Sequence, residues 1–497
     1  MIAVLAFVLA AADIRFAQQE VPGVHVYAVN PLSGAAATNF RHADLDENGE
    51  QDLILPRSVY FNRDNGLDTQ NPLVLPRAAE QPYCDLWGAE VYLLFADRLW
   101  ILRWEEGDWE TVLDQEVAWP RSDDPGASLF PEEEPGVRFK RFLHDFEGDG
   151  VPEIVIASDD GLHVYRRAKS GYASAACLDV FPPLRLAEMP QSRLWPEAKR
   201  KITLPAREMA CWLFLDTDAL TVVNQEDLPG MRLRYRMRRY TLDPENGYAP
   251  VEDATRDTVT EPMPNYLRPC RLNEDDVIDY AGGDWEVSAA TLLPVPIYET
   301  CATTDGAATF HTVRTISLRP KCSFVDYDGD GDLDMVTEAT DLFQGGVRET
   351  VSRFVSCTRV RHGFAVHLQD ARQRLSDAPD LQTRTAIVLD APPFRNTELF
   401  RRYQSGELAD ITGDFNGDGY RDLVAQVRPE HLAVFVGSVK GFASKPAATI
   451  RTLKNRRFGI ADVDGDGLSD IVICWYDYAT EKVGEHCYVY FARERKQ

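Results

Sequence analysis

The chain has 497 residues, of which 44% are hydrophobic and 27% charged, a composition typical of a folded protein and not of a disordered one. Its formal net charge of −26 argues against a nucleic-acid partner and against docking on anionic lipid, because both need a cationic surface. The 30 prolines and 32 glycines predict many turns and few long helices.

The N-terminus is predicted to be a secretory signal. Residues 2–12 form a short apolar run that ends in three alanines, small residues of the kind found at cleavage sites. No lysine or arginine precedes the run, so a first buried strand is the alternative. No second long apolar run follows, and no membrane span is predicted. We expect residues 1–12 to be a signal peptide and the protein to be secreted, periplasmic or at the cell surface.

The predicted elements along the rest of the chain are nearly all strands. Short segments rich in β-branched and aromatic residues occupy residues 90–97, 99–104, 431–437, 470–476 and 486–492. A glycine followed by an aromatic residue leads into a further strand at Tyr172, Tyr248, Phe364 and Phe442, and a variant with one residue between them occurs at Trp109.

A nine-residue acidic loop recurs five times between these strands. Each copy has an acid first, an acid or asparagine third, an aspartate or asparagine fifth, a glycine sixth and a closing acid ninth. One such loop is weak evidence, whereas five with the same spacing indicate a repeated structural unit. The candidate metal ligands are Asp44, Asp46, Asn48, Asp52, Asp145, Glu147, Asp149, Glu153, Asp326, Asp328, Asp330, Asp334, Asp414, Asn416, Asp418, Asp422, Asp462, Asp464, Asp466 and Asp470.

Calcium is the ion predicted for these loops. Ca²⁺ takes about six to eight oxygen ligands, and carboxylates at alternate positions of a tight loop can converge on one point. The glycine permits the sharp turn, and the ninth acid completes the shell. In the last loop the Leu468 carbonyl is a predicted further ligand. The sequence therefore predicts about five Ca²⁺ sites between strands, with acidic turns that hold no metal as the alternative.

Two other assignments fit the loops less well. An EF-hand would place the closing acid three residues later and helices on both sides, and magnesium prefers to keep its waters. Two degenerate copies also occur, a shortened one at Asp216 and one at Asn273, where Arg271 replaces the first acid. We expect no metal at either degenerate copy.

Five intact and two degenerate copies, each with several strands, predict an all-β fold, a seven-bladed β-propeller with calcium-binding inter-strand loops. Residues 13–497 would form this single domain. The segment at residues 32–40 could complete the last module, which favours a closed ring over a linear solenoid.

The spacing of the modules is uneven. We interpret the ranges near 110–136 and 366–405 as insertions, the second of them partly helical. The distance from Asp44 to Asp145 is about twice that of a usual module, so an eighth blade in this gap is the alternative.

The loops and the glycine-aromatic markers resemble the FG-GAP or VCBS repeats of integrin α-subunit propellers and of their bacterial relatives. The resemblance covers nearly the whole chain, from about residue 20 to the end. It implies that the calcium loops lie on one face of a seven-bladed ring and stabilise it, while partners bind elsewhere. It implies metal only at the five loops whose acids stand in register, and it does not specify a ligand.

The function expected from this pattern is that of a protein- or glycan-binding adhesion scaffold. The alternative is a carbohydrate-active enzyme, of the polysaccharide lyase or hydrolase type, on the same framework. The sequence contains no HExxH, GxSxG, P-loop or GxGxxG motif with a suitable acid. His42 and His144 stand at similar positions before two loops, and we expect them to pack rather than to catalyse.

Two further features leave alternatives open. The basic and aromatic stretch at residues 231–248 is either an ordinary strand pair or a patch for an acidic partner. Among nine cysteines, Cys474 could pair with Cys487 and Cys301 with Cys322, with buried free thiols as the alternative.

Overall fold

The computed structural model describes most of the chain. The predicted signal at residues 1–12 and the degenerate loops at Asp216 and Asn273 lie outside the described part, as do the side chains of Cys301 and Cys322. The described residues are 14–22, 24, 26–29, 36–63, 66–95, 97–117, 138–139, 141–158, 161–178, 211–215, 219–228, 232–243, 249–259, 268–270, 278–287, 294–304, 307–314, 321–341, 347–369, 375, 378–389, 392, 408–452, 456–477 and 482–493.

Nearly every described element is a strand, which confirms the all-β prediction. In spatial order, the first large sheet contains β4 (Arg41–Ala43), β5 (Asp52–Ile54), β6 (Ser58–Tyr60) and β9 (Leu73–Val74), and the second contains β13 (Asp108–Glu116), β12 (Arg98–Glu105), β11 (Glu90–Leu94), β10 (Tyr83–Trp87) and β14 (Arg138–Phe139). The third contains β15 (Leu143–His144), β16 (Glu153–Ser158), β17 (Gly161–Ala168) and β18 (Gly171–Leu178). The fourth contains β19 (Cys211–Leu215), β20 (Ala219–Leu228), β21 (Arg232–Asp243) and β22 (Ala249–Val259).

The other four large sheets have the same layout. The fifth sheet contains β23 (Arg268–Cys270), β24 (Asp279–Val287), β25 (Pro294–Thr304) and β26 (Ala307–Arg314), and the sixth contains β27 (Lys321–Val325), β28 (Asp334–Thr340), β29 (Arg359–His367) and β30 (Leu381–Val388). The seventh contains β31 (Ala409–Gly413), β32 (Asp422–Arg428), β33 (His431–Phe435) and β34 (Ala448–Arg451). The eighth contains β1 (Arg15–Glu20), β37 (Lys482–Arg493), β36 (Asp470–Asp477) and β35 (Arg456–Ala461). The remaining elements are the strand pairs β2 (Val26–Val29) with β3 (Ala36–Thr38) and β7 (Asn62–Arg63) with β8 (Gly66–Leu67), the 3-10 turn η1 (Ala78–Glu80) and the helix α2 (Val347–Ser356).

The described residues thus form eight sheets of four or five strands, where the sequence predicted seven modules. The additional sheet is that of β10 to β14, in the long gap between the first two acidic loops. Its first hairpin turns at Gly88 with no acidic loop, so the motif that marks the other sheets is missing there. The alternative reading of this gap, an eighth module, is therefore the one that matches the structure.

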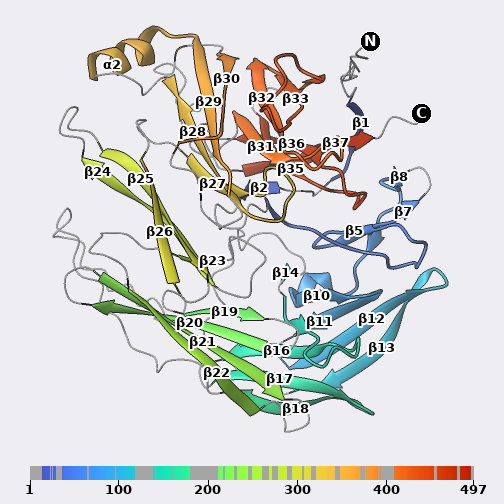
Figure 1. Ribbon diagram of the computed structural model, residues 1–497. Helices are drawn as coiled ribbons and strands as arrows, with labels where there is room; N and C mark the ends of the chain where they lie inside the picture. Colours follow the sequence, from blue (N-terminus) through green and yellow to red (C-terminus); the bar gives the residue numbers. More distant parts are fainter. Residues whose placement is uncertain are drawn as a thin grey trace, which may run out of the picture.

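The large sheets follow one another in chain order around the centre of the molecule (Figure 1). Alternate residues of a strand point to opposite faces of its sheet, and here both faces are buried. On β11, Val91 and Leu93 pack against the sheet of β4 to β9, whereas Tyr92 and Leu94 pack against that of β15 to β18. The core is therefore a series of apolar layers between neighbouring sheets, an arrangement like that of a β-propeller.

The start of the chain completes the last sheet. β1 pairs antiparallel with β37, with Arg15 opposite Arg493, and so covers an edge that would otherwise be open. The sequence placed this closing strand at residues 32–40. Residues 36–38 instead form β3 and pair with β2, whereas Phe16 of β1 packs edge-on against Phe415 of the neighbouring sheet.

The ranges predicted as insertions contain strands as well as connecting chain. β13 begins before residue 110 and forms a hairpin with β12, and β30 supplies the fourth strand of its sheet from within 366–405. The one helix among the described residues, α2, lies earlier, between β28 and β29. Cys474 and Cys487 are bonded across β36 and β37, which confirms that predicted disulfide.

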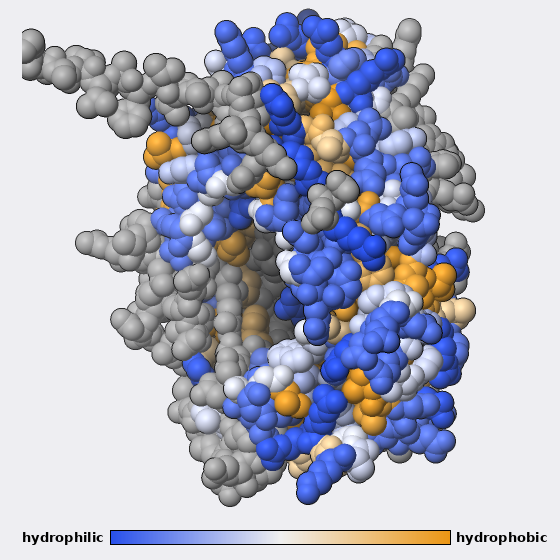
Figure 2. Space-filling model, turned by 90° about the vertical axis from the view of Figure 1, so that its right-hand side faces the viewer, coloured by the Kyte–Doolittle hydropathy of each residue, from blue (hydrophilic) through white to orange (hydrophobic). Residues whose placement is uncertain are grey.

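The surface contrasts with these apolar layers. Figure 2 shows that the side of the molecule at the right of Figure 1 is mostly hydrophilic, with hydrophobic residues in separate small patches. Among the described residues, the large hydrophobic side chains that are clearly exposed are four valines, Val74, Val351, Val355 and Val439. No described helix is long and apolar enough to cross a membrane.

Candidate metal centres

All five acidic loops occupy the same place in their sheets, the connection between the first and second strands. They join β4 to β5, β15 to β16, β27 to β28, β31 to β32, and β35 to β36. Each loop turns through a left-handed residue at its fourth and sixth positions, as at Gly465 (φ 72°) and Gly467 (φ 87°). Glu47 (φ 54°) is the one fourth-position residue of the five that is not glycine.

The first acid of a loop holds the turn together. In the last loop, Asp462 accepts a hydrogen bond from the Gly465 N–H through Oδ1 (2.7 Å) and from the Gly467 N–H through Oδ2 (3.0 Å). Asp414 accepts the matching bonds from Gly417 (2.8 Å) and Gly419 (2.9 Å). Both oxygens of this acid are therefore used locally, and the loop is shaped before any ion is considered.

In four of the loops the ninth acid joins the loop to a segment farther along the chain. Asp470 accepts one hydrogen bond from the Val463 N–H within the loop and another from the Ala492 N–H of β37, both at 2.9 Å. Asp334 does the same with the N–H groups of Tyr327 (2.9 Å) and Gln369 (2.8 Å). These carboxyl groups are completely buried or nearly so.

Burial of the ninth acids changes their titration. Desolvation raises the pKa of Asp52 to about 6, that of Asp334 to about 8 and that of Asp422 to about 7, although backbone hydrogen bonds to each carboxylate oppose the shift. The pKa of Asp470 is also raised well above its usual value, mainly by burial and then by the nearby Asp464. Without a cation close by, these groups therefore keep their proton to a higher pH than an exposed aspartate does.

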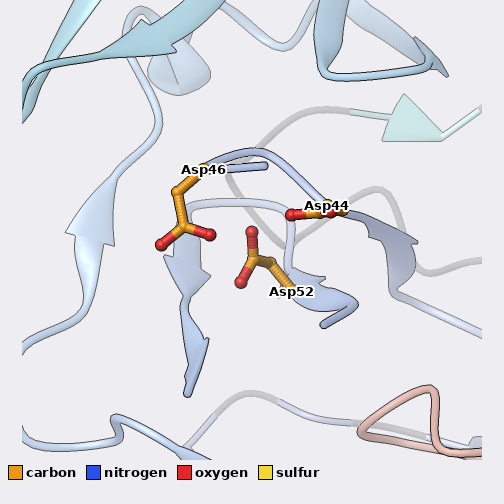
Figure 3. A group of neighbouring side chains, drawn as sticks. All are labelled: Asp44, Asp46 and Asp52. Carbon is orange, nitrogen blue, oxygen red and sulfur yellow. The ribbon is translucent and has the colours of Figure 1, made fainter. Parts of the chain in front are cut away.

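Three loops bring three carboxylates together. In each, one oxygen from the first, third and ninth acids lies within 4.8 Å of the other two. Figure 3 shows one of these clusters, in which the three carboxylates point toward one another from the β4–β5 loop and from the start of β5. The clusters are Asp44, Asp46 and Asp52; Asp326, Asp328 and Asp334; and Asp462, Asp464 and Asp470.

The third acid of each cluster carries a buried oxygen that lacks a hydrogen-bond partner. This oxygen is Oδ1 of Asp46, of Asp328 and of Asp464. A buried carboxylate oxygen without a partner is costly, and it is the kind of ligand that a hard cation takes up. The donor set therefore fits an oxygen-seeking metal ion at these three loops.

The other two loops do not form such clusters within the described residues. In the Asp145 loop the third position is Glu147, which is ion-paired with Arg166 of β17. In the Asp414 loop it is Asn416, whose Nδ2 donates to Asp418 at 3.0 Å. Here the third position is satisfied by the protein itself.

The fifth-position residues also lie outside the clusters. In all five loops the side-chain oxygen of this residue accepts the N–H of the residue two positions later, at distances from 2.7 to 3.0 Å. These residues, which the sequence predicted as ligands, are Asn48, Asp149, Asp330, Asp418 and Asp466. Their hydrogen bonds close the turn.

Neighbouring loops contact one another directly. The Arg421 N–H donates to the Tyr327 carbonyl (2.9 Å), and the Ser469 N–H donates to the Asp414 carbonyl (2.8 Å). Across the closure of the chain, Asn62 Nδ2 donates to the Asp464 carbonyl at 3.0 Å. Three of the loops thus form a continuous row, and Asn62 of β7, whose N–H donates to Asp52, connects the first loop to it. The loop motif encodes none of these contacts.

The histidines beside the loops have packing roles, as the sequence predicted. His42 lies edge-on to Phe40, and its Nε2 is 2.9 Å from the Val463 carbonyl oxygen of the last loop. His144 lies edge-on to Phe146, with ring centroids 4.3 Å apart.

The basic and aromatic stretch forms most of β21. In its register Arg234 stands opposite Glu226 of β20, and Arg236 stands opposite Asp257 of β22. Tyr235 is buried against Tyr280 of the next sheet, with ring centroids 4.8 Å apart. This is the pattern of the ordinary strand pair that the sequence left as one alternative.

Comparison with known proteins identifies one segment by family. Residues 414–473 match the family model described as an FG-GAP-like repeat. This segment contains the last two acidic loops, the strands from β32 to β35 and the first half of β36. The chain therefore carries an FG-GAP-like repeat, as its loops led us to expect, and no curated protein matches it.

Solved structures resemble the chain only weakly. The WD40 domain of SCAP from fission yeast is 10% identical, with 86% of this chain and 96% of that chain covered and a TM-score of 0.26. A hypothetical selenium-binding protein from Sulfolobus tokodaii is 9% identical, with 97% and 91% covered and a TM-score of 0.27. Apocarotenoid oxygenase from Synechocystis is 8% identical, with 94% and 89% covered and a TM-score of 0.25. Likeness at these TM-scores does not decide fold or function.

Proposed function

We propose that the chain is a secreted, calcium-stabilised β-propeller with eight blades that acts as a protein- or glycan-binding scaffold. The observation that carries this proposal is the set of three aspartate clusters, each with a buried third-position oxygen that has no partner. The geometry supports three calcium sites among the five loops in which the sequence predicted them.

Calcium would act on the fold through the ninth acids. In the three clusters these groups join the loop to a segment farther along the chain, but their burial opposes ionisation. A bound divalent ion would compensate the charge and let both hydrogen bonds and metal ligation form at once. An ion that binds only the native state adds about 2.7 kcal/mol of stability per site at a concentration of about 100 times its Kd.

A binding role agrees better with the described residues than an enzyme does. A histidine and a carboxylate do meet at His362 and Glu338, 3.2 Å apart, but their side chains are only 2% and 5% exposed. A substrate cannot reach such a pair without a large rearrangement. A rigid ring with loops at its surface instead presents a binding face without having to move.

The calcium part of the proposal is tested by isothermal titration of EDTA-treated protein with CaCl₂. Asp328→Asn should remove the site of the Asp326 loop and leave the sites of the other two clusters. The matched control is Asn416→Ala, at the same position of a loop that has no cluster, and it should leave calcium binding unchanged. Wild-type protein that binds no calcium would refute the proposal.

The scaffold part is tested by affinity capture. The protein is immobilised and exposed to native cell-envelope extract, once with calcium and once with EDTA, and retained proteins and sugars are identified by mass spectrometry. We expect a calcium-dependent partner that Asp328→Asn retains less well. A retained polysaccharide that becomes shorter on incubation would contradict the scaffold and favour an enzyme, and equal retention in EDTA would contradict a role for calcium.

A further inference from the structure

The last acidic loop differs from the other two clusters because an arginine donates a hydrogen bond to the carboxylate of its third acid. Arg493, at the end of β37, donates from Nη1 to Asp464 Oδ2 at 2.6 Å and to Asp466 Oδ2 at 3.1 Å. Asp464 is only 3% exposed, and its other oxygen, Oδ1, still lacks a partner. The guanidinium therefore supplies part of the positive charge that the cluster needs and leaves one ligand oxygen unsatisfied.

The three clusters differ in how a guanidinium meets them. At the Asp326 loop, Arg421 Nε donates to the main-chain carbonyl of Asp326 at 2.8 Å, and no ion pair to a carboxylate of this cluster occurs among the described residues. In the first loop, Arg63 Nε is 4.0 Å from Asp46 Oδ2, and the Arg63 side chain is 60% exposed. In the last loop the distance is 2.6 Å.

We propose that Arg493 competes with calcium for the last loop. This inference rests on the proposed calcium sites. A divalent ion held by Asp462, Asp464 and Asp470 would stand close to the guanidinium, and two like charges at that range repel in a site shielded from water. The last loop therefore binds calcium more weakly than the Asp326 loop, and binding displaces the guanidinium of Arg493 from Asp464.

The location of Arg493 links this competition to the closure of the ring. Its backbone pairs with Arg15 of β1, and its side chain lies over the ring of Phe491, 5.0 Å from the centroid. The residue before it, Ala492, donates its N–H to Asp470 of the same cluster. β37, which pairs with β1, thus carries both the Ala492 N–H that donates to Asp470 and the Arg493 side chain that competes with calcium for the last loop.

Calcium titration of Arg493→Gln tests the proposal directly. This change removes the charge, and we expect the weakest calcium site to become at least about tenfold tighter, equal to about 1.4 kcal/mol. Arg63→Gln is the matched control, because its guanidinium is more distant and exposed, and it should change no Kd by more than about twofold. The gain should disappear in the double variant Asp464→Asn with Arg493→Gln.

A measurement on the wild-type protein tests the same proposal without depending on the folding of a variant. Phenylglyoxal modifies accessible arginines, and modified peptides are quantified by mass spectrometry with and without CaCl₂. We expect calcium to increase the modification of Arg493 and to leave that of the distant Arg167 unchanged. Equal or lower modification of Arg493 in calcium would overturn the proposal.

The outcomes separate the two levels of inference. If wild-type protein binds calcium and Arg493→Gln leaves every Kd unchanged, or weakens the last site, the competition is refuted while the calcium sites stand. If neither protein binds calcium, both the sites and the competition are refuted.

Discussion

The buried ninth acids predict an unusual pH dependence for the metal-free protein. Burial raises the pKa of Asp334 from 3.8 to about 8. Between these two values the native state keeps a proton that the unfolded state has released. The free energy of unfolding therefore falls as pH rises through this window, and it is highest below the unfolded pKa. At 1.36 kcal/mol per pKa unit, Asp334 alone accounts for a loss of roughly 6 kcal/mol.

Calcium should remove this loss because it stabilises the ionised form of the cluster. We expect the urea midpoint of EDTA-treated protein to fall from about pH 5 to about pH 8, and that of calcium-saturated protein to stay level or rise. Asp85 is an internal control. Its pKa is also raised by burial, but it lies outside the loops, so its contribution is the same in both conditions.

The measurement is a set of urea unfolding curves at several pH values with EDTA or CaCl₂. A midpoint that rises with pH in EDTA would show that the ninth acids are ionised in the metal-free fold, and the electrostatic reasoning would fail. Parallel curves with and without calcium would show that the ion does not act through these groups.

Three further predictions concern the geometry of the loops and the last hairpin. Gly465→Ala should lower stability by more than Gly467→Ala, because a Cβ at Gly465 would lie 2.4 Å from Gln51 Cβ whereas the position at Gly467 is open; equal effects in urea unfolding would contradict the loop packing. Glu47→Gly should raise the free energy of unfolding by up to about 1 kcal/mol, since it relieves a left-handed residue, and a lower urea midpoint would refute this. Cys474→Ser should lower stability by about 3 kcal/mol because the disulfide closes a short hairpin, and an unchanged melting temperature would show that it contributes nothing.

Local sequence patterns predicted the loops well because everything that shapes them lies within nine residues. The first acid caps the turn, the sixth residue needs a left-handed backbone, and the ninth acid reaches back to the second residue. Each of these interactions requires a particular type of residue at a fixed position in the loop. For the same reason the motif identified the five places where a first strand meets a second.

Other features could not be predicted because they depend on contacts between distant segments. The sheet of β10 to β14 has no acidic loop, since its first hairpin turns tightly at Gly88. The closing strand β1 is recognised only through its pairing with β37. Arg493 and Arg166 form ion pairs with acidic loops that lie far from them in the sequence. The residues next to the loop motif therefore give no sign of these arginines.

The three acids of a cluster have different dependence on a metal ion. The ninth acid has both oxygens hydrogen-bonded to backbone N–H groups, and so has the first acid of the Asp44 and Asp462 loops, so these loops can form without metal. The third keeps a buried oxygen with no partner wherever it is an aspartate, as at Asp328. Where the third residue is Asn416 or Glu147, its side chain is instead hydrogen-bonded or ion-paired within the protein. On the proposed function, the identity of the third residue would decide which loops bind calcium, while the first, fifth and ninth positions shape the turn that all five loops share.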